Sequence, residues 1–567
     1  MHVRLCTSRR WDRTENASSS LLVALAALCF VALDARAQSV PITPAPVAAP
    51  TYQPGIDVLD YDIVLELPDT GAFLRGDVTI TAKRSAGVSR LRLDLVDRLT
   101  VRAVELNGAL VTAPHASGKL DVPLTGATGD SVRVRVSYDG VVTDGLVVKK
   151  DSRGRWSWFG DNWPDRARQW LPTVDHPSDK ATVTWTVRAP TGRTVVANGL
   201  EAGTRRLSGR AAGRTETRWR ESRPIATYMM VIAVGPITRF DLREPDCHYG
   251  DQGQCVRQSI YVAPENRHWL PGPFLASGPI MLLFEGLIGP FPYEKLAHLQ
   301  SATRYGAMEN ASAIFYDGKL FAGPTIKDDI IAHETAHQWF GDAVTEREWS
   351  HLWLSEGFAD YFTSLWIQYI RGDGAFQKRM KATRDTILAD PVVAARPVLD
   401  TAQTDYMALL NNNSYKKGEY VLYMLHQRLG DSAFFRGIKS YYATYRHGTV
   451  LSDDLRREME RSSGQSLGQF FEQWLRRPGA AEPSVGWAWD ASAQSVSLFV
   501  LQEGARGAYE LPLTVVLTDA DNKEHRLVVN VPAEGRATVP IPGRFAARPR
   551  SLTFDPDAFL LARIGRL

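Results

Sequence analysis

Cysteine is scarce in this sequence: the 567 residues include only four. A dense disulfide framework is therefore excluded as the main source of stability. Excess charge of one sign is also lacking, since 66 Lys and Arg residues stand against 63 Asp and Glu residues. That balance argues against a protein whose partner is nucleic acid or an anionic membrane surface. Beyond the N-terminal segment, no apolar run is long enough to cross a bilayer as a helix.

Apolar residues make up 44% of the chain, which is enough for sizeable hydrophobic cores. A chain of this length exceeds one ordinary domain several times over, and we expect about two to four domains. The sequence contains no internal repeat. A multidomain globular protein is the class that these quantities favour.

Residues 1–37 have the pattern of a secretory signal peptide. Arginines precede the apolar run Leu21–Leu33, and the small residues Ala35 and Ala37 mark a cleavage site. The alternative is an uncleaved anchor, but the run is too short to span a bilayer. We therefore expect export to the periplasm or the extracellular space.

Two of the four cysteines, Cys6 and Cys29, would leave with the signal peptide. Cys247 and Cys255 remain close together in a stretch rich in Gly, Asp and Gln. An oxidising compartment would pair them, so a disulfide between them is expected.

The mature chain divides by composition into four parts. Residues 38–55 are rich in Pro and Ala and predict an extended tether. Residues 56–245 contain short β-branched segments with Gly, Asp and Pro turns, which indicate a β-rich domain. Residues 246–478 show helical spacing and predict a mainly helical domain. Strand patterns return over 479–567 and predict a small β-sandwich, so the expected fold class is multidomain α+β. Helices are expected at 280–288, 328–341, 352–370, 415–429 and 467–475.

A metal-binding pattern lies in the helical part. His333 and His337 are four residues apart, so both imidazoles lie on one face of a helix and can reach one ion. Zinc in hydrolases usually takes three protein ligands and leaves one position for water. Eighteen residues separate His337 from Glu356, which sits in a second amphipathic helix and supplies the third ligand.

Glu334 follows the first ligand directly, and its position has a chemical meaning. Zinc lowers the pKa of a bound water to about 7, and an adjacent carboxylate can take the proton. The same carboxyl group can then deliver that proton to a departing amine, so Glu334 serves as base and as acid.

Three motifs in order make the sequence resemble the gluzincin aminopeptidases, which include aminopeptidase N and the leukotriene hydrolase. They are the segment Gly306–Asn310, the His333–His337 helix with Glu356, and Tyr415-Lys416-Lys417-Gly418. The resemblance covers nearly all of the mature chain and implies a thermolysin-like catalytic domain after a β-rich domain. Larger members carry a long helical C-terminal domain. This chain resembles a short form without it, for which we expect a more open cleft.

The resemblance implies a role for each motif. Glu309 would bind the free α-amine of a peptide, which is mostly cationic at neutral pH. The backbone of Gly306, Ala307 and Met308 would line the substrate. Tyr415 would donate its hydroxyl to the oxyanion, a contribution usually worth about a hundredfold to a thousandfold in rate. Without the resemblance, Glu309 would be interpreted as a surface acid and Tyr415 as a core tyrosine.

One departure from the family concerns a second amine anchor. The family usually has a Gln or Glu in the N-terminal domain, and here Asp175-His176-Pro177 matches the neighbouring motif only in part. Asp161 is the candidate substitute. The alternative is that Glu309 acts alone.

The function expected from these residues is that of an aminopeptidase with one Zn²⁺ per chain, acting on peptides with a free N-terminus. Two other hypotheses stay open. The first is an endopeptidase or epoxide-type hydrolase that uses the same zinc, and the second is a catalytically inactive binding or scaffold protein. An acetylated substrate separates the first from an aminopeptidase, and zinc content measured together with turnover separates the second. The preferred N-terminal residue and the oligomeric state are not predicted.

Overall fold

The structure, a computed structural model, describes residues 52–125, 129–242, 256–321, 326–504 and 506–567. The predicted signal peptide, most of the tether, and both Cys247 and Cys255 lie outside the described residues. Of the helices in these ranges, none combines the length and the hydropathy that a bilayer crossing requires.

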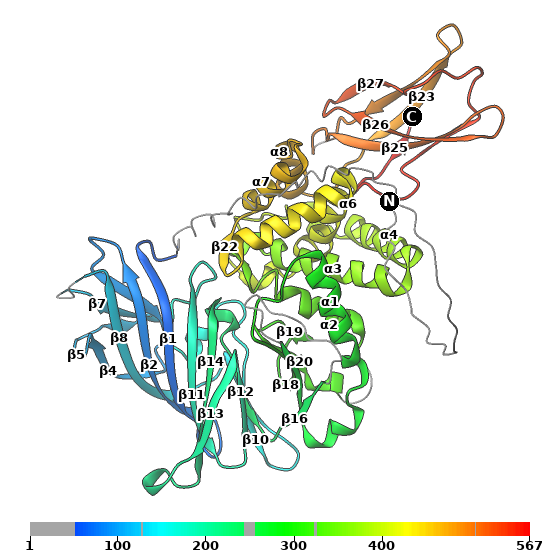
Figure 1. Cartoon of the computed structure of the whole chain (residues 1–567). Coiled ribbons are helices and arrows are strands. Elements are labelled where there is room, and N and C mark those ends of the chain that lie inside the picture. The colour runs from blue at the N-terminus through cyan, green and yellow to red at the C-terminus, as the bar shows by residue number, and fades with distance from the viewer. Residues whose placement is uncertain (1–51, 126–128, 243–255, 322–325, 505) are drawn as a thin grey trace, which may run out of the picture. The chain divides into compact units, whose positions relative to one another are not determined.

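The N-terminal domain is built on strands, as the sequence predicts (Figure 1). Strand β8 (Ser131–Val141) shows why: Val132, Val134 and Val136 point inward and are buried while the residues between them face outward. An eight-stranded sheet has the order β13-β14-β11-β1-β2-β8-β4-β5, in which β1 pairs with β11 in parallel. Two smaller sheets, β12-β15-β10-β9 and β3-β7-β6, complete the domain. The remaining bounds are β1 (Ile56–Glu66), β2 (Phe73–Arg84), β3 (Arg90–Asp94), β4 (Thr100–Leu106), β5 (Ala109–Leu110), β6 (His115–Ala116), β7 (Lys119–Pro123), β9 (Leu146–Lys150), β10 (Trp156–Gly160), β11 (Lys180–Pro190), β12 (Thr194–Ala197), β13 (Leu200–Arg206), β14 (Arg214–Ala226) and β15 (Ile232–Gly235).

The part of the chain that follows contains the predicted helices, and it also contains a five-stranded sheet that the sequence patterns did not predict. The sheet has the order β16-β17-β18-β20-β19. Strand β18 (Lys295–Ser301) is buried along nearly its whole length, so its residues do not alternate between apolar and polar. The strand β16 (Thr238–Asp241) pairs with β17, which places it in this sheet although it precedes the predicted boundary at residue 245. The other strands are β17 (Arg257–Val262), β19 (Ala307–Met308) and β20 (Ala313–Asp317), with the short pair β21 (Val344–Glu346) and β22 (Gly448–Val450).

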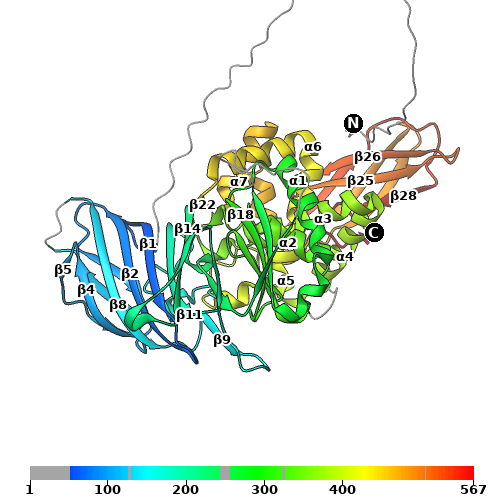
Figure 2. The ribbon, with the colours of Figure 1, turned by 60° about the horizontal axis from the view of Figure 1, so that its bottom comes forward.

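Helices α2 and α3 pack against each other in this part of the chain (Figures 1 and 2). The α-helices are α1 (Ser277–Leu287), α2 (Asp328–His337), α3 (Trp353–Arg371), α4 (Asp373–Ala389), α5 (Pro391–Ala395), α6 (Gly418–Tyr445), α7 (Ser452–Ser463) and α8 (Gly468–Phe471). Two π-helical turns, η9 (Asn413–Lys417) and η10 (Glu472–Arg476), adjoin α6 and α8. Short 3₁₀ turns lie at Ala167–Gln169, Gly209–Ala211, Thr227–Met229, Pro264–Trp269, Gly272–Ala276, Gly318–Phe321, Trp349–His351 and Tyr406–Leu409.

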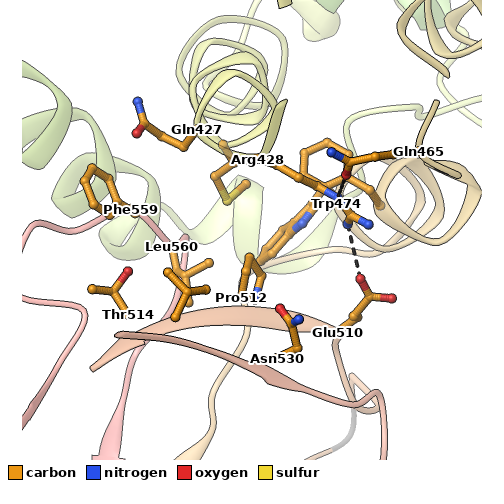
Figure 3. Close-up of a pocket in the computed structure, with 13 residues that line it drawn as sticks. Gln427, Arg428, Gln465, Trp474, Glu510, Pro512, Thr514, Asn530, Phe559 and Leu560 are labelled. Carbon is orange, nitrogen blue, oxygen red and sulfur yellow. Dashed lines mark hydrogen bonds and ion pairs between the residues drawn. The ribbon is translucent and has the colours of Figure 1, made fainter. Parts of the chain in front are cut away.

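Two sheets form the C-terminal domain, with the orders β27-β24-β23-β29 and β26-β25-β28. Each sheet turns alternate side chains inward, for example Val496 and Leu498 from one and Leu513 and Val515 from the other. A cavity of about 610 Å³ lies between α6 and strands β25 and β26, and the ion pair of Arg428 with Glu510 (3.2 Å) borders it (Figure 3). The strands are β23 (Ser484–Asp490), β24 (Ser495–Leu501), β25 (Leu511–Thr518), β26 (Glu524–Val531), β27 (Arg536–Pro540), β28 (Ser551–Phe554) and β29 (Gly565–Arg566).

Buried polar contacts join the N-terminal domain to the helical part. The ammonium of Lys180 donates to the carbonyls of Asp342 (2.8 Å) and Ala343 (2.9 Å), just after α2. The amide of Asn198 donates to the carbonyl of Ala311 (2.8 Å), just after β19. The N-terminal domain therefore supports both segments that carry predicted site residues.

Candidate metal centre

The two predicted histidine ligands meet on one face of α2. The Nε2 atoms of His333 and His337 lie 3.1 Å apart. His337 is buried, and 18% of the His333 side chain is exposed. One helical turn separates the two residues, and the four-residue spacing alone accounts for their meeting.

Glu356 from α3 completes a group of three. Its Oε2 lies 3.3 Å from Nε2 of His337 and 3.5 Å from Nε2 of His333. Zinc with ligands at about 2.0–2.1 Å in a tetrahedron requires ligand atoms roughly 3.3 Å apart. The three atoms have this spacing, and their chemistry, two imidazoles and a carboxylate, is that of zinc in hydrolases. The residues present therefore fit a zinc ion.

Each imidazole is also held on its far side. Nδ1 of His337 lies 3.2 Å from the carbonyl of Phe340 and 3.0 Å from Oγ of Ser355. Nδ1 of His333 lies 3.2 Å from Oδ1 of Asp360. Partners of this kind fix the ring orientation and the tautomer of a metal-binding histidine. Neither Ser355 nor Asp360 was predicted from the sequence, although both lie within one turn of Glu356.

The charges in the site follow from burial and from these contacts. Burial is the largest influence on Glu356 and would raise its pKa, but His337 and His333 lower the pKa to about 2. Burial raises the pKa of Glu334 above its usual value, against the charges of His333 and His337. Glu356 therefore stays ionised as a ligand, whereas Glu334 is disposed to accept a proton.

Glu309 lies at the end of β19, the edge strand of the five-stranded sheet. Gln338, the residue after His337, ties this segment to the metal helix. Its Nε2 donates to the carbonyl of Glu309 (2.7 Å), and its Oε1 accepts from the backbone N–H of Ser312 (2.8 Å). Gln338 was not predicted from the sequence, in which it stands out only as a polar residue beside Trp339 and Phe340.

The carboxyl group of Glu309 is buried, with 7% of the residue exposed. Burial raises its pKa to about 7; the nearby charge of His337 opposes this shift, while Glu356 and Glu334 add to it. The charges of the metal ligands thus act on the pKa of Glu309. A buried carboxylate beside two others is stabilised by any cation that enters the site.

Tyr415 belongs to the π-helical turn η9, a distortion that is frequent at functional sites. Its ring is stacked over His333, with centroids 6.2 Å apart and planes 14° from parallel. Burial, followed by the charge and hydrogen bond of Glu356, raises the pKa of Tyr415 well above 10. The phenol therefore keeps its proton near neutral pH and can donate it in a hydrogen bond.

The backbones of α3 and η9–α6 approach closely at two glycines. A Cβ added to Gly357 would lie 2.8 Å from Cα of Gly418, closer than real side chains allow. Gly357 follows the metal ligand Glu356, and Gly418 closes the motif that begins with Tyr415. The absence of both side chains lets the two helices bring these residues together.

Asp161 has other partners than a substrate amine. It is fully buried, and its carboxylate lies 3.1 Å from Arg166 and 3.3 Å from Arg304. The same two guanidinium groups also pair with the carboxylate of Asp144, at 2.8 and 2.6 Å. Its assignment as a second amine anchor stays a prediction.

A cavity of about 410 Å³ opens beside the metal ligands. Gly306 and Ala307 of the predicted substrate strand line it together with His333, Glu334 and Asp360. The larger cavity at the C-terminal domain includes none of these residues.

Two segments of the chain match known domains. Residues 58–229 match the peptidase M1 N-terminal domain, and residues 278–474 match the peptidase family M1 domain. Aminopeptidase N of Streptomyces lividans is 27% identical over 90% of this chain and 62% of its own length. Probable aminopeptidase 1 of Saccharolobus solfataricus is 26% identical over 62% of this chain and 45% of its own length. The chain thus spans about half of the length of these curated relatives.

Solved structures give matches over nearly their whole length. The M1 zinc metallopeptidase of Deinococcus radiodurans has a TM-score of 0.65 and 27% identity, covering 74% of this chain and 94% of that one. A variant of that enzyme bound to a Tyr-Ser-Ala substrate matches with the same TM-score and identity. The strand-built N-terminal domain and the helical domain agree with these matches, and the chain belongs to peptidase family M1.

Proposed function

We propose that this protein is an aminopeptidase that binds one zinc ion through His333, His337 and Glu356. Its substrates are peptides with a free N-terminus, from which it removes the first residue. The relatives named aminopeptidase support this activity, and so does the M1 zinc metallopeptidase that matches in structure.

The observation that carries the proposal is the buried carboxylate of Glu309 beside the metal ligands. The carboxylates of Glu309, Glu334 and Glu356 are all buried, and the charges of the latter two raise the pKa of Glu309. A divalent ion and one ammonium group together match their charge. An internal segment of a peptide offers no such ammonium, so this arrangement favours cleavage at the N-terminus over internal cleavage.

The edge position of β19 supports the way in which a peptide would lie. Among the described strands, Ala307 and Met308 pair with β20 alone, because β19 ends the order of this sheet. An extended peptide can add to such an edge through main-chain hydrogen bonds. With its amine at Glu309, the peptide would run back toward Gly306 and the cavity of about 410 Å³.

Protein groups supply the proton transfers. When bound, zinc acts as a Lewis acid and lowers the pKa of water to about 7. Glu334 takes a proton from the attacking water and delivers it to the leaving amine. Tyr415 donates a hydrogen bond to the carbonyl oxygen as negative charge develops there.

Fluorogenic aminoacyl amides test the proposal, measured before and after removal of metal by a chelator and again after addition of zinc. We expect turnover that requires zinc and that disappears when the substrate amine is acetylated. Equal turnover of an acetylated peptide would instead support an endopeptidase, and stoichiometric zinc without turnover would support a binding or scaffold role.

We also propose that the protein is exported, on the strength of the signal-peptide pattern in residues 1–37. Sequencing the N-terminus of the protein recovered from a host that secretes it tests this. A mature chain that begins after Ala37 is expected, and recovery of the uncut chain in the cytoplasm would refute it.

A further inference from the structure

Asp360 lies one turn after Glu356 on α3 and has partners on two other elements. Its side chain is 8% exposed. Oδ1 lies 3.2 Å from Nδ1 of His333, which belongs to α2. Oδ2 lies 2.9 Å from the ammonium of Lys416, which belongs to η9. One buried carboxylate thus connects three elements of the site.

The contact with His333 differs in kind from the contacts of the other metal-binding histidine. His337 has two neutral partners on its Nδ1, the carbonyl of Phe340 and the hydroxyl of Ser355. His333 instead has a charged partner on its Nδ1, the carboxylate of Asp360. With Nε2 directed at Glu356, Nδ1 of His333 carries the proton and donates it to Asp360. A carboxylate acceptor orients the ring and makes the imidazole a better ligand.

The contact with Lys416 reaches the other side of the site. Lys416 adjoins Tyr415 in the π-helical turn η9. Its ammonium also lies 3.8 Å from Glu419, which is fully buried and accepts a hydrogen bond from Thr383 (3.2 Å). Lys416 is therefore fixed between α3 and the start of α6. These contacts tie the turn that carries Tyr415 to α3.

We propose that Asp360 is a positioning residue with two separate tasks. Its Oδ1 orients the imidazole of His333 toward the metal. Its Oδ2, through Lys416, holds the turn that presents the phenol of Tyr415. Neither task involves contact with the substrate's reacting atoms.

The first task is tested on the zinc affinity of the apoprotein, measured by competition with a chromogenic chelator. Asp360→Ala removes the acceptor, and its zinc dissociation constant should rise about tenfold to a hundredfold. Ser355→Ala should change it less, because the carbonyl of Phe340 still holds His337. Asp360→Glu should recover part of the loss. The thermal midpoint of each apoprotein identifies any variant that fails to fold.

The second task is tested with Lys416→Met, which leaves the Asp360–His333 contact in place. Its zinc dissociation constant should stay within about twofold of the parent value, as for a change that leaves the ligands alone. Its kcat should fall by about tenfold through misplacement of Tyr415, while KM changes little. Lys416→Arg keeps a cation beside Asp360 and should restore most of the rate.

Asp431→Asn is the matched control, since Asp431 pairs with His426 at 3.0 Å on α6 and is 90% exposed. It should alter neither zinc affinity nor kcat.

The proposal is overturned if Asp360→Ala binds zinc as the parent does, or if Lys416→Met weakens zinc as much as Asp360→Ala. It is equally overturned if Lys416→Met keeps the parent kcat. The kcat measurement rests on the proposed aminopeptidase function, whereas zinc affinity does not. A parent protein that hydrolyses no aminoacyl amide would therefore refute that function and still leave the first task testable.

Discussion

Gln338 should be required both for stability and for the placement of Glu309. It is fully buried and makes three hydrogen bonds: to the carbonyl of Glu309 (2.7 Å), from the N–H of Ser312 (2.8 Å) and to the carboxylate of Asp342 (2.9 Å). Gln338→Met keeps most of the side-chain volume and removes all three bonds. The change therefore isolates hydrogen bonding from cavity formation.

The expected cost follows from the groups left without partners. A buried polar group that loses its partner costs about 1–3 kcal/mol, so the two backbone groups alone give roughly 2–6 kcal/mol. Release of the Glu309 carbonyl should also let the end of β19 move. Misplacement by about 1 Å can cost on the order of a hundredfold in rate, and kcat/KM on aminoacyl amides should fall about tenfold to a hundredfold.

Urea denaturation and steady-state kinetics on the same preparations measure the two effects. Gln502→Met is the matched control, since buried Gln502 binds the backbone of Tyr509 through both its donor (2.9 Å) and its acceptor (3.0 Å) in the C-terminal domain. It should lose stability and keep kcat/KM. The reasoning fails if Gln338→Met is destabilised by less than about 0.5 kcal/mol, the range of ordinary surface changes. It also fails if its kcat/KM matches that of the control.

Four further changes probe the site and its support. Glu334→Gln should retain zinc, as measured by metal analysis. Its turnover should fall by at least about a hundredfold, because no group is left to move the proton. Turnover near the parent value would exclude Glu334 as the base. Glu309 must be ionised to bind an ammonium group, and burial raises its pKa to about 7. Bound zinc would lower that pKa, so kcat/KM should rise with pH through a limb at or below about pH 7. Glu309→Gln should keep only the acid limb that Glu334 sets, and an unchanged pH profile would contradict the assignment. Burial lowers the pKa of His298 to about 3 from its usual 6.5. Between these two pH values the unfolded chain binds a proton that the native chain does not. The free energy of unfolding should therefore fall by about 1.4 kcal/mol per pH unit as the pH drops below 6.5. Urea titrations of His298→Gln should show a shallower acid slope, and a parent-like slope would count against it. Gly357→Ala should lower both the thermal midpoint and kcat, because its Cβ would meet backbone atoms of Gly418; parent-like values of both would show that the helices can separate freely.

Strands and ligand positions were predicted correctly where residues recur at a regular spacing along the sequence. The alternation in β8 and its neighbours predicted the N-terminal strands, and the spacing of His333 and His337 predicted one ligand face. The strands around β18 were not predicted, because burial on both faces removes the alternation. Strand β19 is only two residues long, and its pairing depends on β20 rather than on its own composition.

The supporting residues of the site were harder to predict than its ligands. Gln338, Ser355 and Asp360 act through neighbours distant in sequence, and each is an ordinary polar residue on a helix until those neighbours are placed. The π-helical turn that holds Tyr415 likewise has no periodic pattern of its own. Glu356 was predicted from its place on the next amphipathic helix, and Tyr415 through resemblance to a family. The structure brings both beside His333.

The contact between Gly357 and Gly418 has a consequence for how this site can diverge. Where two side chains meet, a larger residue on one helix can be offset by a smaller one on the other. Here main chain meets main chain, so no such exchange exists. The separation between the carboxylate ligand and the phenol is therefore set by the backbone. Substitutions that alter substrate preference are expected in the surrounding walls rather than at this crossing.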